Sequence, residues 1–201
     1  MKKTLVWVAL LAAVAMCAIW MVGGYNKMVT AEENVENAWG QVQAQYQRRM
    51  DLIPSIVSSV QGLADAERLT FTEVMEARSK ATAVTIDPSN MTEEQLANFQ
   101  RVQGELQSSL SRLLVTIEKY PELNTHKEVH ALIVELEGTA NRITVARNNF
   151  NDVAKEFNTL VRRFPNNIVA GMFGFEKKPY FKADEGAEKA PEVKFDFNKK
   201  E

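Results

Sequence analysis

The sequence has few of the residues that build turns, metal cages or disulfides. Its 201 residues include one cysteine, which excludes an intrachain disulfide and a thiolate zinc cage. Two histidines leave little material for a histidine-based metal site. Nine glycines and six prolines are too few for a protein built of strands and tight turns. The composition therefore favours an all-helical protein.

An excess of charge of one sign is also missing. There are 24 lysines and arginines against 26 aspartates and glutamates, which gives a net charge of −2. Because no surplus of positive charge is available to neutralise phosphates, the chain is not expected to bind nucleic acid. Apolar residues make up 45% and charged residues 25% of the chain, a balance that excludes wholesale disorder.

Motifs of catalysis are absent as well. No Gly-x-Gly-x-x-Gly or Gly-Lys-Ser/Thr sequence is present to cradle a phosphate. His126 and His130 are four residues apart and would share a helix face, but Lys127 stands where a zinc protease carries glutamate. We therefore expect no catalytic, cofactor-binding or metal-binding residues, and we predict that the chain is not an enzyme.

One long hydrophobic run stands apart from the rest of the sequence. Residues 5–22 contain no charged residue, and as a helix they reach about 27 Å, close to the thickness of a bilayer's hydrocarbon core. Trp7 and Trp20 lie near its two ends, where membrane proteins place aromatic residues. The run is longer than the apolar core of a cleaved signal peptide. Residues 1–24 are therefore predicted to be a membrane anchor.

Two alternatives remain open for this segment. It can be a signal peptide that is removed, or Cys17 can carry a lipid. Lipidation requires a small residue directly before the cysteine, and Met16 is not small. The interpretation that we favour is that Cys17 is an apolar residue within the span.

The charges that flank the span predict its orientation. Lys2 and Lys3 precede the span, whereas Lys27 follows it together with several glutamates. Positively charged flanks tend to stay in the cytoplasm. We therefore predict a single-pass protein with its N-terminus in the cytoplasm and its body, residues 25–183, outside.

The body carries the alternating three- and four-residue apolar spacing of packed helices. In the first helix, Pro54 predicts a kink near Met50, because proline removes a backbone donor and clashes one turn back. A second helix is expected over about residues 65–84, and Asp-Pro-Ser-Asn at 87–90 ends it. The first apolar stripe is Val35, Trp39, Val42, Tyr46, Arg49, Ile53, Ile56, Val60 and Leu63.

Two more long helices follow. Thr92 and Gln95 have the spacing of a capping box, which predicts a helix from there to about Lys119. The last helix is expected over about residues 126–164, and Pro165 ends it. A strict period of 3.5 residues in its stripe predicts the shallow crossings of a four-helix bundle. That stripe is Val129, Leu132, Leu136, Thr139, Ile143, Ala146, Phe150, Val153, Phe157, Leu160 and Phe164.

Together these segments predict an all-α fold, in which an N-terminal transmembrane helix precedes an antiparallel up-and-down bundle of three or four long helices. We expect four. Residues 184–201 form a charged tail that is expected to be mostly disordered, because its composition cannot bury a core. Within the tail, residues 193–197 alternate like a strand, and the alternative is that they dock on the sheet edge of a partner.

Several charged residues occupy positions on or beside the apolar stripes. Arg49 lies in the stripe of the first helix, and Arg147 replaces an apolar residue beside the stripe of the last. A desolvated guanidinium needs a carboxylate or carbonyl partner. We therefore take Arg49, Arg78, Arg147 and Glu137 as candidate buried polar or ion-pair positions, and we expect Arg49 and Arg147 to pair with carboxylates. The alternatives are a polar ligand pocket in the bundle and arginines that reach the surface.

The stretch at 168–181 is apolar and rich in aromatic residues. If four helices run alternately away from the membrane and back, the last one ends near the bilayer. Met172, Phe173, Phe175, Tyr180 and Phe181 are then a candidate interfacial segment. Lys177, Lys178 and Lys182 would face anionic head groups. The alternative is that this stretch caps the open end of the bundle core.

Many short motifs occur in order across the body. They include Tyr25-Asn26, Ala38-Trp39, Arg48-Arg49-x-Asp51-Leu52-Ile53-Pro54, Glu76-Ala77-Arg78, Glu118-Lys119-Tyr120-Pro121, Phe150-Asn151, Phe157-Asn158 and Phe164-Pro165-x-Asn167-Ile168. Through these motifs the chain resembles the LemA family. It departs from the family pattern in carrying Phe-Asn where the family usually has Tyr-Asn, and Ala140 where the family usually has glutamate.

The resemblance implies a single-pass bacterial membrane protein whose body is an antiparallel helical bundle. The family has no established enzymatic activity, and one branch is associated with magnetosome membranes. We therefore expect a non-enzymatic scaffold or adaptor of the bacterial envelope, without a cofactor, which contacts the membrane and a protein partner and can form a homo-oligomer. The alternatives are a small-ligand sensor and a membrane-remodelling protein.

Overall fold

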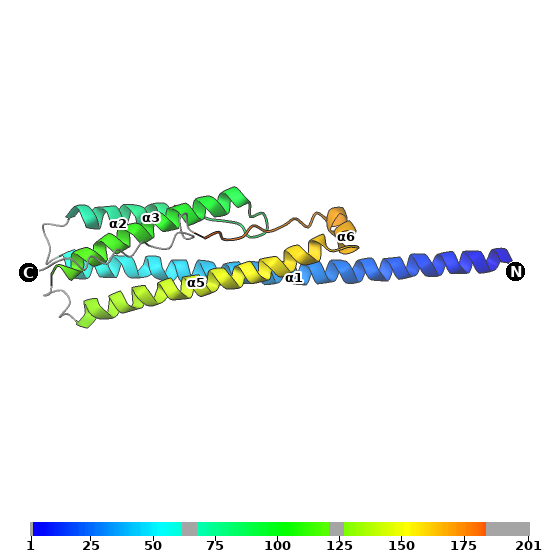
Figure 1. Cartoon of the computed structure of the whole chain (residues 1–201), viewed down its shortest axis with the longest axis horizontal. Coiled ribbons are helices and arrows are strands. Elements are labelled where there is room, and N and C mark those ends of the chain that lie inside the picture. The colour runs from blue at the N-terminus through cyan, green and yellow to red at the C-terminus, as the bar shows by residue number, and fades with distance from the viewer. Residues whose placement is uncertain (1, 62–67, 121–126, 184–201) are drawn as a thin grey trace, which may run out of the picture.

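The computed structural model describes residues 2–61, 68–120 and 127–183, and these form an all-α fold (Figure 1). The helices are α1 (Lys2–Gln61), α2 (Arg68–Ala83), α3 (Glu93–Glu118), α5 (Lys127–Arg162) and α6 (Asn166–Phe173). The prediction of four long antiparallel helices is confirmed. The short α6 was not predicted, because eight residues are too few to establish a period. The charged tail and His126 lie outside the described residues.

Helix α1 joins the apolar run and the first bundle helix in one rod. Its 60 residues correspond to about 90 Å at 1.5 Å per residue. The N-terminal part extends beyond the other helices (Figure 1), and Leu5, Leu11 and Ile19 there are 72%, 65% and 74% exposed. Within the described residues, α1 alone is long and apolar enough to cross a membrane. It is therefore the candidate transmembrane helix.

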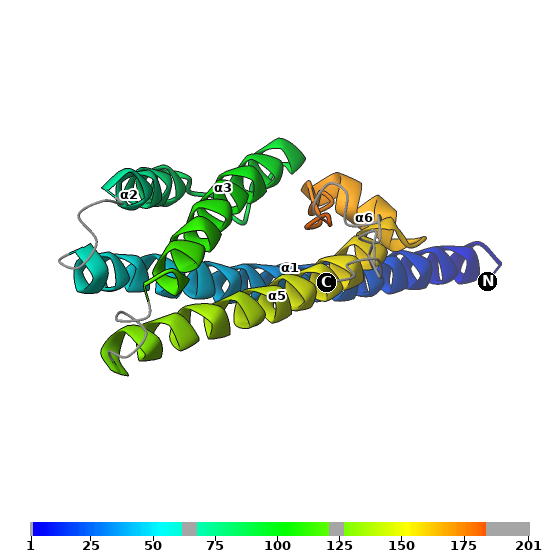
Figure 2. The same ribbon diagram turned by 60° about the vertical axis from the view of Figure 1, so that its left-hand side comes forward.

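The long helices alternate in direction. Helix α1 runs away from its apolar end, α2 returns, α3 runs outward again and α5 comes back (Figures 1 and 2). Helix α5 packs along α1, and α2 packs along α3. As a result α5 ends beside the part of α1 where the apolar run stops, and α6 lies there in contact with both helices.

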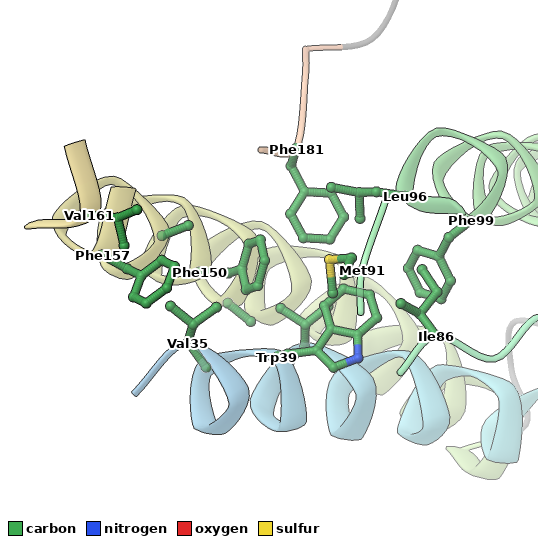
Figure 3. Close-up of a cluster of buried hydrophobic side chains, with 14 of the residues drawn as sticks. Val35, Trp39, Ile86, Met91, Leu96, Phe99, Phe150, Phe157, Val161 and Phe181 are labelled. Atoms are coloured by element: carbon green, nitrogen blue, oxygen red, sulfur yellow. The ribbon is translucent and has the colours of Figure 1, made fainter. Parts of the chain in front are cut away.

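The core consists of two clusters of buried side chains. The cluster nearer to the apolar end is rich in aromatic residues, with the ring of Trp39 centred 5.4 Å from Phe99 and 5.7 Å from Phe150 (Figure 3). The distal cluster is mainly aliphatic and includes Ile53 and Leu110. The described positions of the α1 stripe are all buried, as predicted.

The stripe of α5 follows a different period from the predicted one at its C-terminal end. Ala154 and Val161 are buried, Val153 and Leu160 are half-buried, and Phe164 is 77% exposed. The prediction of a core position for Phe164 was therefore wrong. An α-helix has 3.6 residues per turn, so a strict 3.5-residue stripe drifts around the helix by about 20° per heptad.

The predicted start of α3 is confirmed in detail. The backbone N–H of Gln95 donates to Thr92 Oγ1 at 3.1 Å, and the backbone N–H of Thr92 donates to Gln95 Oε1 at 3.0 Å. This capping box satisfies two of the backbone donors that every helix leaves free at its N-terminus.

The chain turns back after α6. Gly174 ends the helix with a φ of 76°, a left-handed conformation that glycine adopts without steric cost. Residues 175–183, called here the C-terminal strap, then run without regular secondary structure along α5 toward the beginning of α3 (Figure 1). The strap closes the aromatic cluster from above, as the position of Phe181 in Figure 3 shows.

Candidate functional site

The most deeply buried charge in the bundle is Arg49 on α1, which is 4% exposed. Its guanidinium donates to the side-chain oxygens of Gln103 and Gln107 on α3, at 3.0 Å for Gln107, and lies over the ring of Tyr46. Burial lowers the pKa of Arg49 from its ordinary value, but an arginine stays protonated at neutral pH. The prediction of a carboxylate partner was wrong, because amide oxygens of α3 occupy that place.

This cluster is not fully satisfied. Arg49 Nε and Gln45 Oε1 are buried without a hydrogen-bond partner in the described part of the chain. Gln107 also lines a cavity of about 240 Å³ between α3 and α5. Gln45 lines a groove of about 690 Å³ between α1 and α5. Because the Arg49 cluster has spare hydrogen-bonding capacity and its Gln107 lines a cavity, it is the part of the core best suited to hold a small polar ligand.

A second polar residue, Arg78, compensates for a hydrogen bond that Pro54 removes from α1. Pro54 has no backbone N–H, so the carbonyl of Met50, one turn earlier, loses its helical donor. Arg78 Nε from α2 donates to that carbonyl at 2.8 Å. The helix continues through Pro54 to residue 61. Among the described residues Arg78 makes no ion pair. Its side chain instead supplies the hydrogen bond that the proline removes.

Replacing Arg78 with methionine should lower the free energy of unfolding by about 1–2 kcal/mol, because the half-buried Met50 carbonyl loses its donor. In a Pro54→Ala background the same change should cost less than about 0.5 kcal/mol, since the alanine N–H then serves the carbonyl. Denaturant unfolding of the full chain in detergent, followed by circular dichroism, measures both values. Equal costs in the two backgrounds would refute this interpretation; Arg112→Met, at an exposed ion pair, is the matched control.

The two Phe-Asn motifs of α5 each serve two partners. Phe150 and Phe157 are completely buried in the aromatic cluster. The amide of Asn158 donates to the Lys178 carbonyl and accepts from the Lys178 N–H, both at 2.8 Å. Asn151 makes the same pair of bonds with the backbone of Phe181, at 3.0 and 2.8 Å. The two asparagine side chains thus satisfy backbone N–H and C=O groups of the strap, as a neighbouring β-strand would. They also fix the position of the strap along α5.

Lys178 joins the strap to two other elements. Its side chain is 5% exposed, and Nζ forms an ion pair with Glu32 on α1 at 2.7 Å. Nζ also donates to the carbonyl of Ser89, in the α2–α3 connection, at 2.9 Å. The expectation that Lys178 faces lipid head groups was therefore wrong. Lys182, also expected there, pairs with Glu93, and this hydrogen bond holds the pKa of the glutamate below its ordinary value.

The remaining predicted ion-pair positions differ from expectation. Arg147 is half-buried, donates to the carbonyl of Lys182 at 3.0 Å and lies over the ring of Phe181, with no carboxylate partner in the described residues. Glu137 is exposed at the rim of the small α3–α5 cavity. On α5 the neighbouring Glu135 forms ion pairs with Arg48 and Arg142, and its pKa is lowered chiefly by the Arg48 hydrogen bond.

The predicted interfacial segment divides into two parts. Phe181 is 6% exposed and its ring lies 5.5 Å from Phe150, so its assignment to the interface was wrong and it caps the core instead. Phe175 is half-buried, with its ring 6.5 Å from that of Phe157. Met172, Phe173 and Tyr180 are 62%, 53% and 42% exposed. The strap carries the buried members, whereas α6 carries the two most exposed.

No constellation of catalytic type occurs among the residues that the structure describes. These residues contain no group of three histidine, cysteine, aspartate or glutamate side chains that can hold a metal ion. His130 is exposed on α5, and Cys17 is exposed within the apolar run. The arrangement offers hydrogen-bonding surfaces and hollows rather than a nucleophile beside a base.

Comparison with known proteins finds one matching family and several relatives. Residues 38–195 match the sequence model of the LemA family. Protein LemA of Metamycoplasma hominis is 24% identical over 164 residues, which cover 82% of this chain and 71% of the relative. Magnetosome protein MamQ 2 of Paramagnetospirillum magneticum is 25% identical over 194 residues, which cover 87% of this chain and 70% of the relative. MamQ of Magnetospirillum gryphiswaldense is 24% identical over 177 residues, which cover 78% of this chain and 64% of the relative.

Proposed function

The chain belongs to the LemA family, and on this premise we propose that it is a membrane-anchored scaffold or adaptor of the bacterial envelope without enzymatic activity. The apolar helix and the relatives named as magnetosome proteins support a membrane-associated protein. The names of the relatives denote no enzyme.

The observation that carries this proposal is the continuity of α1. The candidate span and the first bundle helix share one unbroken helix, with no linker between residues 22 and 35. A flexible linker would let the body swing freely, whereas a continuous helix fixes its distance and tilt relative to the bilayer. A body attached to the membrane through one continuous helix suits a protein that positions a partner at a defined distance from the membrane.

The proposed topology follows from the flanking charges. Lys2 and Lys3 stay in the cytoplasm, and the body extends from the other side of the membrane. Protease added to the outer face of spheroplasts then digests the body, while complete protection of the body would reverse this orientation.

We place the partner on the groove between α1 and α5. This groove is lined by residues of both helices, including Gln41, Asn149 and Val145, and Val145 is 68% exposed beside it. Such a hollow along two long helices accepts a further helix, which would bury the exposed valine.

The partner test uses the full chain, purified from native membranes in detergent. We expect one protein to co-purify in a fixed ratio, to remain with Val115→Glu, and to be lost with Val145→Glu. Val115 is 54% exposed on α3, away from the groove, and is therefore the matched control. Loss with both variants, or with neither, would contradict this docking site, and recovery of lipid alone would favour membrane remodelling.

A small-ligand sensor is the second candidate, and the partly unsatisfied Arg49 cluster is the observation that favours it. Native mass spectrometry of the same preparation measures bound small molecules. A molecule that co-purifies with the parent and is absent from Arg49→Met would establish the sensor, whereas an unliganded mass in both would exclude it.

A further inference from the structure

Helix α6 lies directly beside the point where α1 leaves its apolar run. A side-chain carbon on Gly24 would meet Val169 Cγ2 at 3.7 Å and Asn166 Oδ1 at 3.8 Å, which are ordinary contact distances and place α6 against α1 at this residue. The ring of Tyr25 is centred 4.8 Å from that of Phe173. Two to three residues separate these contacts from Val22, the end of the run, which corresponds to about 3–5 Å along the helix axis.

The side of α6 that faces away from the bundle is apolar. Val169 and Ala170 are buried against the body, whereas Ile168 and Met172, one turn apart, are 51% and 62% exposed. Phe164, which precedes α6 next to Pro165, is 77% exposed, and Phe173 is 53% exposed. Other exposed large apolar residues of the described body, such as Val115 and Val134, are scattered singly. A cluster of four within ten residues marks an interaction surface.

Basic residues flank this cluster in the sequence at Arg162, Arg163 and Lys177, and Lys27 lines the hollow next to α6. Arg162, Arg163, Lys27 and Lys177 are exposed, and none of them forms an ion pair among the described residues. Next to α6, a cavity of about 750 Å³ extends from Trp20 to Arg163. Its lining includes three basic residues, Lys27, Lys155 and Arg163, and two acidic ones, Asp152 and Glu156. The surplus of positive charge matches the head groups of anionic lipids.

We propose that α6 is an interfacial helix, with Phe164, Ile168, Met172 and Phe173 inserted into the lipid surface around the emerging span and Arg162, Arg163, Lys27 and Lys177 on anionic head groups. This inference rests on the proposed membrane crossing of α1. The bilayer is the occupant because the surface begins within one helical turn of the end of the span, where lipid is already present. A second contact of this kind fixes the rotation of the body about the axis of α1, which the span alone leaves free.

The test places an environment-sensitive fluorophore on single cysteines of the full chain, in a Cys17→Ala background that has no other cysteine. Variants Met172→Cys, Val134→Cys and Ile19→Cys are labelled with a nitrobenzoxadiazole dye and reconstituted into vesicles of phosphatidylcholine and phosphatidylglycerol. We expect blue-shifted emission and quenching by brominated lipid for the label at position 172. The label at Val134, which is similarly exposed on the distal part of α5, should show neither.

The label at Ile19 separates the two levels of inference. Quenching at position 19 without quenching at 172 would overturn the interfacial helix and leave the span intact. No quenching at position 19 would instead overturn the membrane crossing itself. Blue-shifted emission at 172 that brominated lipid does not quench would also contradict the proposal, because a protein surface would then cover α6. Circular dichroism of the three labelled variants confirms that each remains folded.

Discussion

Replacing Lys178 with methionine should lower the free energy of unfolding of the body by about 3 kcal/mol. The substitution keeps most of the aliphatic side chain but leaves Glu32 without its cation and the Ser89 carbonyl without its donor. The glutamate is 27% exposed and regains some solvation, so the cost lies at the lower end of what breaking a buried pair entails. Denaturant unfolding of the full chain in detergent, followed by circular dichroism, gives the value.

The neighbouring lysine is the matched control for this substitution. Lys177 is exposed and makes no ion pair in the described part of the chain, so Lys177→Met should change the stability by less than about 0.5 kcal/mol. If Lys178 instead faced lipid head groups, both variants would unfold like the parent. Equal stability of the two variants would therefore contradict the buried ion pair.

Shortening Phe181 to alanine should destabilise the body by about 3 kcal/mol or more, through lost burial and the cavity that remains. Its ring packs on both Trp39 and Phe150 (Figure 3). The guanidinium of Arg147 lies over the same ring. Phe173→Ala, on the exposed face of α6, should cost less than about 1 kcal/mol in the same unfolding measurement. The reverse order of these two values would contradict the burial of Phe181 and the exposure of Phe173.

The substitutions of Lys178 and Phe181 both test the C-terminal strap. The strap contacts α1 through Lys178, α5 through the two asparagines and α3 through Lys182. It follows α6 directly, so its attachment determines where α6 lies relative to the end of the span. Loosening the strap should therefore weaken the lipid contact of α6 as well as the stability of the bundle.

Local patterns predicted the local features well. The capping box at Thr92 depends on residues three positions apart, and its geometry is confirmed. The stripe of α1 is buried because it repeats over several turns of one helix. Arg49 and Arg78 were recognised as unusual polar positions, but their partners were not identified. Amide groups and a backbone carbonyl satisfy them, and neither kind of group stands out in a sequence as a carboxylate does.

The sequence by itself determined the all-α class, the apolar run of residues 5–22 and most of the buried faces of the long helices, and it favoured four long helices over three. Each of these follows from composition or from a period that repeats along a single element. The tertiary structure alone decided that Phe181 is buried while Phe173 is exposed, and that Lys178 pairs with Glu32. Residues 175–183 have no regular period that would show which of their side chains are buried. Their burial depends on how α1, α3 and α5, which are distant in sequence, pack against one another and against the strap.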